Sequence, residues 1–241
     1  MSVPVKARLR QLICYAVIAA PLAAFGQGTT TISYDNLNVD ILDNDPNGVQ
    51  NSQTVAGLQG SISSIQVGLM IAGTGSGAFN GDYFVELVND AGGFAVLLNR
   101  SGVSSANPYG YSDNGFNVTF SDSAANGIHF YQNGAYTLNL AGQLTGTWRP
   151  DGENISPWSS VPSDYDAQNQ TAMLSSFIGE DPNRTWTLLL ADVSDGGTGQ
   201  LVGWSLTITT VPEPPETGLL VLGLIVGAWL LRSQKRHGSG C

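Results

Sequence analysis

The stretch Leu174–Thr210 constrains the fold of this chain more than any other. It holds two runs of alternating apolar and polar residues, separated by an Asp- and Gly-rich segment, Asp192–Gly199. Alternation places apolar side chains on one face of a β-strand, and the segment between has the composition of a turn. Trp186 begins the apolar face of the first run and Trp204 that of the second. We therefore expect the closing hairpin of a β-sandwich, with both indole rings in its core.

Other stretches predict further strands. Apolar residues alternate in Ile65–Ile71 and Phe116–Phe120, while Phe94–Leu98 and Tyr136–Leu140 predict two more strands. No long amphipathic helical pattern lies within Gln27–Val211, which has the length of one domain with a two-layer core. We expect a single all-β domain over this range.

Two segments without strand patterns predict loops. Gly73–Gly77 is rich in glycine but lacks the strand–helix context of a phosphate-binding loop, so it predicts a hairpin loop. Gly152–Thr171 is polar and predicts a loop longer than is usual in a compact domain.

The charge of the chain is one-sided. The formal net charge is −10, and residues 27–211 contain seventeen Asp and Glu, three Arg and no Lys. This argues against nucleic acid as a partner. It fits either divalent cations or solubility outside the cell, and the sequence leaves both open. Cys14 and Cys241 lie outside this range, so no disulfide holds the predicted domain.

One short motif has the form of the start of a calcium-binding loop. Asp43, Asp45 and Asn47 offer oxygens at alternate positions, and Gly48 follows. An EF-hand would need a Glu where Thr54 stands, so the EF-hand is excluded. The motif predicts either a calcium site of another kind or a plain Asx-type turn.

The residues of Leu174–Thr210 also carry a family resemblance. The stretch resembles the end of the P domain, the β-sandwich that follows the catalytic domain of kexin- and furin-like convertases. Arg184 departs from the pattern, because the family has Gly there. The resemblance implies an all-β, jelly-roll-like β-sandwich. The matching residues are Leu174, Ser175, Phe177, Gly179, Trp186, Thr187, Leu188, Asp192, Gly199, Leu201, Trp204, Leu206 and Ile208.

The resemblance covers roughly residues 43–210 and adds to the candidate metal ligands. Two aspartates lie in turns that match the family, where carboxylates can meet a cation. The candidate calcium ligands are therefore Asp43, Asp45, Asn47, Asp122 and Asp192.

Residues 1–26 have the organisation of a secretory signal peptide. Lys6, Arg8 and Arg10 form a basic region, Leu12–Ala20 is apolar, and a small-x-small cleavage site ends at Gly26. We expect export and a mature chain that begins near Gln27.

The C-terminal end has the organisation of a membrane-directed signal. An apolar run, Gly218–Leu231, is followed by basic residues that start at Arg232, and it is preceded by Pro212, Glu213 and Pro214. The layout resembles PEP-CTERM sorting signals of Gram-negative bacteria, which are thought to be processed by exosortases.

This resemblance implies a sorting signal over residues 212–236 with one transmembrane helix, and a cytoplasmic tail over 237–241. An exosortase-type enzyme and the membrane would then be partners of the chain. An ordinary single-span anchor is the alternative.

The predicted domain shows no catalytic constellation. Its one histidine, His129, has no Cys partner and no nucleophile motif, so it predicts a packed or surface residue. The neighbouring carboxylates Asp164 and Asp166, or Glu180 and Asp181, lie in polar, loop-like sequence. Solvated loop charge is the expected role, and glycoside hydrolysis by such a pair is the alternative.

Three functions follow as hypotheses. The first is an exported, non-catalytic protein of the outer envelope or cell surface, with a binding or structural role in the extracellular polysaccharide matrix. Its partner would be polysaccharide or another surface protein. The second is a polysaccharide-active hydrolase that uses loop carboxylates. The third comes from the P-domain resemblance, which implies an accessory to a subtilisin-like protease. Because this chain contains no protease domain, that protease would be a separate protein.

Overall fold

In the computed structural model of the chain, residues 27–212 are described. They form two β-sheets, and their only helices are four short 3-10 turns. The six-stranded sheet has the order β1-β10-β4-β7-β8, and β2 also pairs with β10. The strands of this sheet are β1 (Gly28–Tyr34), β2 (Val39–Ile41), β4 (Ser61–Gly73), β7 (Gly115–Phe120), β8 (Leu144–Trp148) and β10 (Gly199–Val211).

The four-stranded sheet has the order β3-β9-β5-β6 and is antiparallel throughout. In the larger sheet the pair β7–β8 is parallel and the other pairs are antiparallel. The strands of the smaller sheet are β3 (Asp45–Thr54), β5 (Tyr83–Asn89), β6 (Phe94–Asn99) and β9 (Thr185–Asp192). The 3-10 turns are η1 (Asn80–Asp82), η2 (Tyr131–Asn133), η3 (Pro162–Asp166) and η4 (Leu174–Phe177).

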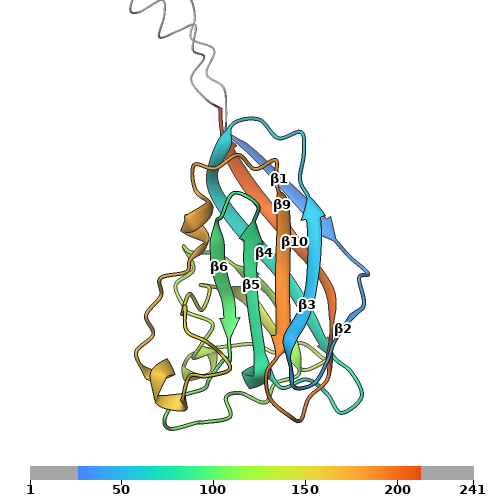
Figure 1. The fold of residues 1–241 in the computed structure, drawn as a ribbon, viewed down its shortest axis with the longest axis vertical. Helices are drawn as coiled ribbons and strands as arrows, with labels where there is room; N and C mark the ends of the chain where they lie inside the picture. The colour runs from blue at the N-terminus through green and yellow to red at the C-terminus, as the bar shows by residue number, and fades with distance from the viewer. Residues whose placement is uncertain (1–26, 213–241) are drawn as a thin grey trace, which may run out of the picture.

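The two sheets pack face to face as a β-sandwich. Figure 1 shows β3, β9, β5 and β6 as one layer in front of β1, β10 and β4. Leu69 and Leu206 from the larger sheet and Leu87 and Leu188 from the smaller one belong to a single buried cluster. Their strands alternate buried and more exposed positions, as strands with one face on a core do. The expected all-β sandwich is thus confirmed for the described residues.

The predicted closing hairpin is wrong in its connection. The strands β9 and β10 lie where the alternation places them, but they belong to different sheets and do not pair. Trp186 and Trp204 are 0% and 2% exposed. Both rows of apolar side chains face the core from opposite sides, so residues 193–198 cross from one sheet to the other. Alternation shows which side of a strand is buried, and it does not show which sheet the strand joins.

Two other local predictions are corrected. Residues 74–79 connect β4 to η1 and β5 of the other sheet, so Gly73–Gly77 is not a hairpin loop, although Thr74–Gly77 does form a turn. Tyr136–Leu140 forms no strand. Its alternate apolar residues Tyr136, Leu138 and Leu140 are all exposed, and Leu140 is completely so. These side chains have no core to pack against, so their alternation does not produce a strand.

The strands β1 to β3 carry little apolar alternation, and sequence analysis did not predict them. The Thr-rich β1 lies at a sheet edge and pairs along its length with β10, from Gly28 opposite Thr210 to Tyr34 opposite Trp204. Cross-strand hydroxyl pairs add to this pairing, such as Thr29 with Thr209 at 2.9 Å. The first and last strands therefore leave the sandwich at the same tip (Figure 1).

No helix in the described part of the chain is long and apolar enough to cross a membrane. The predicted transmembrane helix, the signal peptide and the cytoplasmic tail lie outside the described residues.

Candidate functional site

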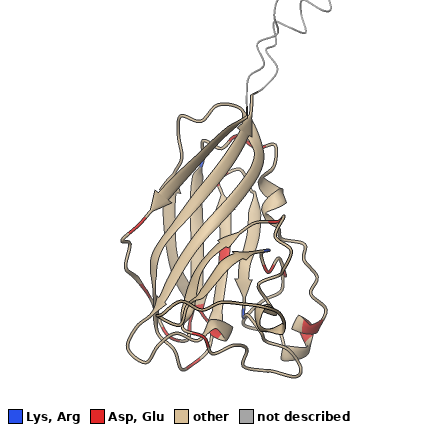
Figure 2. Ribbon diagram, turned by 180° about the vertical axis from the view of Figure 1, so that it is seen from behind, with Lys and Arg blue, Asp and Glu red and all other residues tan. Residues whose placement is uncertain are grey.

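Most acidic residues lie in loops and at strand ends (Figure 2). Three of them, Asp43, Asp82 and Asp192, lie close enough for their charges to interact, at the end of the sandwich remote from Gly28 and Val211, and are called here the acidic cluster. Asp192 ends β9 opposite Tyr83, and the next residue, Val193, donates to the carbonyl oxygen of Asp82 at 2.9 Å. Asp43 Oδ1 accepts the N–H of Gly196, in the crossing segment, at 3.0 Å. Strand pairing thus brings together carboxylates far apart in sequence.

Two carboxyl groups of the acidic cluster, those of Asp82 and Asp192, have raised pKa values. Burial and the charge of Asp192 raise the pKa of Asp82 to about 7, and Arg100 only partly offsets this. Burial, together with the charge of Asp43, raises the pKa of Asp192 to about 6. Asp192 Oδ2 is buried and has no hydrogen-bond partner among residues 27–212. Carboxylates held together in this way favour either a proton or a cation.

In the presence of a chelator, the domain is expected to lose stability as the pH rises. The folded pKa values of Asp82 and Asp192 lie above the usual value of 3.8. Between that value and about 7, the folded state therefore holds more protons than the unfolded state, and stability falls with rising pH. Thermal melting in EDTA should give a higher midpoint at pH 5 than at pH 8. Asp82→Asn should flatten this dependence, and a slope unchanged in this variant would contradict the assignment.

The predicted calcium ligands do not all come together. Asp45 Oδ1 accepts both the backbone N–H and the side-chain amide of Asn47, at 3.0 and 2.9 Å, which is the geometry of an Asx turn. Asp122 lies beside Ser63, at the start of β4, whereas Asp43 lies beside Thr74, after the end of β4. Asp45 lies opposite Asp192 in the pairing of β3 with β9, but its side chain is engaged in the Asx turn. The structure places Asp43 and Asp82 near Asp192, and sequence analysis did not name Asp82 as a ligand.

The carboxylate of Asp122 has a structural partner of its own. Its two oxygens accept the backbone N–H groups of Leu174 and Ser175, at 3.1 and 2.7 Å, where η4 begins. Helix starts leave such N–H groups without a partner inside the helix.

Asp122→Ala is expected to destabilise the domain by about 0.5–2 kcal/mol, the cost of losing a capping side chain. Chemical denaturation measures the change. Asp35→Ala is the matched control, because Asp35 is exposed and makes no side-chain hydrogen bond among the described residues. An equal effect of both substitutions would show that Asp122 does not cap η4.

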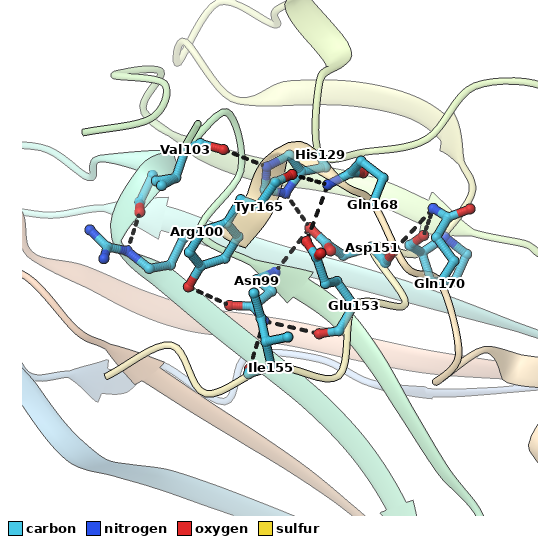
Figure 3. A network of polar contacts seen from close by, with 12 residues as sticks. Asn99, Arg100, Val103, His129, Asp151, Glu153, Ile155, Tyr165, Gln168 and Gln170 are labelled. Carbon is cyan, nitrogen blue, oxygen red and sulfur yellow. Dashed lines mark hydrogen bonds and ion pairs between the residues drawn. The ribbon is translucent and has the colours of Figure 1, made fainter. Parts of the chain in front are cut away.

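A second polar cluster lies where irregular segments cover the edge of β6. The backbone of Asp151 and Gly152 donates to Leu97 and Val96 of β6, at 3.1 and 2.9 Å. Gly127 bridges to Arg149 in a parallel β-bridge, which places His129 beside Asp151. His129, Asp151 and Glu153 form this cluster, called here the His–Asp–Glu cluster (Figure 3).

Every polar atom of the His129 ring is engaged inside the protein. Nδ1 lies 2.7 Å from Asp151 Oδ2, and Nε2 lies 2.8 Å from the carbonyl oxygen of Val103. The ring is 1% exposed and stacks on Tyr165, with centroids 5.7 Å apart. Burial alone would lower the pKa of His129, but the charge of Asp151 and the hydrogen bonds outweigh it and raise the pKa. His129 is thus a packed residue whose nitrogens do not face solvent.

Glu153 is fully buried beside Asp151, so the two carboxylates affect each other. Burial and the charge of Asp151 raise the pKa of Glu153 to about 7. Its Oε2 accepts the side-chain amide of Gln168 at 3.2 Å. Sequence analysis did not name Asp151 or Glu153, because no motif relates them to His129. Their one sequence signal is acidic charge directly after an apolar strand and a proline.

An open cleft of about 340 Å³ lies against the His–Asp–Glu cluster. Gln168 and Gln170 line the cleft and reach inward, to Glu153 and to the carbonyl oxygen of Asp151. No acidic residue lines it. The lining residues are Asn126, Gly127, Phe130, Tyr131, Asn133, Gly134, Ala135, Trp148, Arg149, Gln168 and Gln170.

The paired carboxylates suggested as hydrolase candidates each accept a hydrogen bond from within the domain. Asp164 accepts the N–H of Val161, and Asp166 accepts that of Ser105, both at 2.9 Å. Asp181 accepts the N–H of Asn183 at 2.9 Å. Glu180 accepts the side-chain amide of Asn89.

The predicted sorting motif lies almost wholly outside the described residues. Pro212 is the last residue described and follows β10 directly. Glu213 and Pro214 lie beyond it.

No family model matches the chain, and no curated protein matches it. Among solved structures, a complex of the Aeromonas sobria serine protease with a chaperone matches at 15% identity, with a TM-score of 0.40 over 78% of this chain. The serine protease of Aeromonas sobria alone matches at 17% identity, with a TM-score of 0.39 over 77% of this chain. In each match the chain spans 27% of the length of the other protein.

Proposed function

We propose that this chain is an exported, non-catalytic surface protein whose cleft beside Trp148 binds extracellular polysaccharide. The observation that carries the proposal is the lining of the cleft. The side-chain amides of Asn126 and Asn133 line it without a hydrogen bond among the described residues, whereas Gln168 and Gln170 line it but donate inward to the protein. Amides both donate and accept hydrogen bonds, and so match the hydroxyl groups of a sugar.

Phe130 and Arg149 add the remaining features of a sugar site. Phe130 is partly exposed in the cleft and offers an apolar surface for a sugar ring. Arg149 is the one charged residue of the lining, and among residues 27–212 it makes no ion pair. A guanidinium without a carboxylate partner favours a polysaccharide with acidic groups. The volume lies within the range of ordinary ligand sites.

The proposal also covers the signal peptide, the C-terminal sorting signal and the P-domain resemblance. Residues 1–26 direct export, and the PEP-CTERM-like signal that contains Pro212 holds the chain at the envelope until an exosortase-type enzyme processes it. The domain is a P-domain-like, jelly-roll sandwich. Because β1 and β10 leave the sandwich at one tip, attachment there leaves the cleft beside β8 accessible.

Calcium completes the proposal as a stabilising ion. The acidic cluster is the candidate site, because Asp192 Oδ2 is a buried oxygen without a partner among the described residues, and burial with the charges of neighbouring aspartates raises the pKa of Asp82 and of Asp192. These three residues would hold the ion, which would supply positive charge between them.

Polysaccharide binding is tested with the full chain by affinity electrophoresis through gels that contain neutral or uronic-acid polysaccharides. Arg149→Ala and Asn133→Ala are each expected to weaken binding by about tenfold, since each removes about one hydrogen-bonding group. Asn117→Ala is the matched control, because Asn117 is an exposed amide that lines a different hollow. The proposal is contradicted if no polysaccharide retards the chain, or if Asn117→Ala weakens binding as much as the other two substitutions do.

Calcium is expected to raise the thermal midpoint of the chain relative to excess EDTA. An ion that binds only the folded state adds about 2.7 kcal/mol at a hundredfold excess over its dissociation constant. Asp192→Asn should abolish most of the shift, whereas Asp122→Asn should leave it intact because Asp122 lies elsewhere. Coincident midpoints in calcium and EDTA would show that no such site exists.

A further inference from the structure

The His–Asp–Glu cluster leaves two carboxylate oxygens without a partner in the protein interior. Asp151 Oδ1 and Glu153 Oε1 are buried and accept no hydrogen bond among the described residues. Both side chains are 0% exposed. A buried carboxylate oxygen without a partner loses its hydration and gains nothing in return. Two such oxygens side by side favour a proton or a cation between them.

The hydrogen bonds of His129, the third member of the cluster, match those of a metal-binding histidine. A carbonyl oxygen only accepts, so His129 Nε2 carries the hydrogen that it donates to Val103. This contact fixes the ring and directs Nδ1 toward Asp151. Donation by one ring nitrogen to a backbone carbonyl, while the other faces the metal, is the usual outer-shell arrangement of ligating histidines.

The geometry brings all three donors to one point. The ligand atoms of His129, Asp151 and Glu153 lie within 4.8 Å of one another. Figure 3 shows the three side chains turned toward one another. Metal–ligand bonds of about 2.0–2.2 Å to nitrogen and oxygen place ligands of one ion within this span.

We propose that His129, Asp151 and Glu153 bind one divalent transition-metal ion, of the zinc or manganese class. An imidazole with two carboxylates suits such ions, whereas calcium favours oxygen ligands alone. The ion replaces the hydrogen bond between His129 Nδ1 and Asp151, and binding releases the shared proton to solvent. All three side chains are buried, so the ion holds protein segments together and does not meet a substrate. The ion joins the segment around His129 to the loop after β8, and this loop forms the inner wall of the cleft.

The test uses the full chain, stripped with EDTA and dialysed. One equivalent of Zn²⁺ or Mn²⁺ is expected to bind per chain, as measured by elemental analysis after gel filtration, and to raise the thermal midpoint. Cobalt substitution should give visible absorption bands typical of a coordinated ion.

Two variants separate metal binding from folding. Glu153→Gln keeps the shape and the contact with Gln168 but removes the charge, so the variant should fold. It should bind Zn²⁺ more than about 100-fold more weakly, because outer-shell changes alone cost 10–100-fold. Asp35→Asn is the matched control, because Asp35 is exposed and makes no side-chain hydrogen bond among the described residues, and it should bind Zn²⁺ as the unchanged chain does.

The proposal is overturned if the stripped chain binds none of these ions, or if Glu153→Gln binds Zn²⁺ with unchanged affinity. A Glu153→Gln variant that melts higher than the unchanged chain, with no metal bound to either, would show that a proton occupies the cluster. Polysaccharide binding is measured separately, so either result leaves that proposal to its own test.

Discussion

Trp204→Ala is expected to destabilise the domain by about 3–5 kcal/mol, among the largest effects of any single substitution in it. The ring is 2% exposed and packs on Tyr34 with centroids 4.8 Å apart. Its Nε1 donates to Asn51 Oδ1 at 2.8 Å, from β10 in one sheet to β3 in the other. The substitution therefore leaves a cavity and also removes a hydrogen bond that joins the two sheets.

Trp186→Ala should cost a similar amount, since its ring is fully buried against Phe177 and its Nε1 donates to Pro182. The measurement is denaturant unfolding followed by circular dichroism. Trp158→Ala is the matched control, because Trp158 is 47% exposed, and its cost should be about 1 kcal/mol or less. Equal costs for Trp158 and the two buried tryptophans would show that the core is assigned to the wrong face.

The second large effect is expected for Asp151→Ala, at about 3–5 kcal/mol, because it removes one partner of a buried charged pair. The backbone N–H of Asn99 and Nδ1 of His129 would both lose their acceptor. Unfolding should be measured in EDTA, so that the result reports the pair itself and not a bound ion.

Arg184→Ala is the control for Asp151→Ala. Arg184 Nε lies 3.8 Å from Asp90 Oδ1, and both side chains are partly exposed. Such exposed pairs contribute about 0–1 kcal/mol. If Asp151→Ala costs no more than this control, His129 and Asp151 do not interact as a buried pair.

The fold class was predictable because apolar and polar residues alternate along the strands that form the core. Leu69, Leu188 and Leu206 all face inward as their periodicity requires. The connections were not predictable, because β9 and β10 carry the same alternation whether they pair or face each other across the core. The polar strand β1 was missed because its pairing depends on β10 and not on apolar residues of its own.

The candidate sites depend on contacts that sequence does not display. Asp192 was named from a turn, but Asp82 joins it only through pairing of β5 with β9. His129 was expected to be packed or exposed, and its partners Asp151 and Glu153 come from a loop that lies along β6. The P-domain resemblance, the signal peptide and the sorting signal stay predictions, since no family model matches and both ends lie outside the described residues.

The central claim is that the cleft beside Trp148 binds polysaccharide, and nitrogen-15 NMR of the side-chain amides tests it most directly. Titration with oligosaccharides of the polysaccharide that binds should shift the amide signals of Asn126, Asn133, Gln168 and Gln170, while Asn117 stays unchanged. Shifts confined to Asn117 and its neighbours, or no shift at saturating oligosaccharide, would contradict the claim.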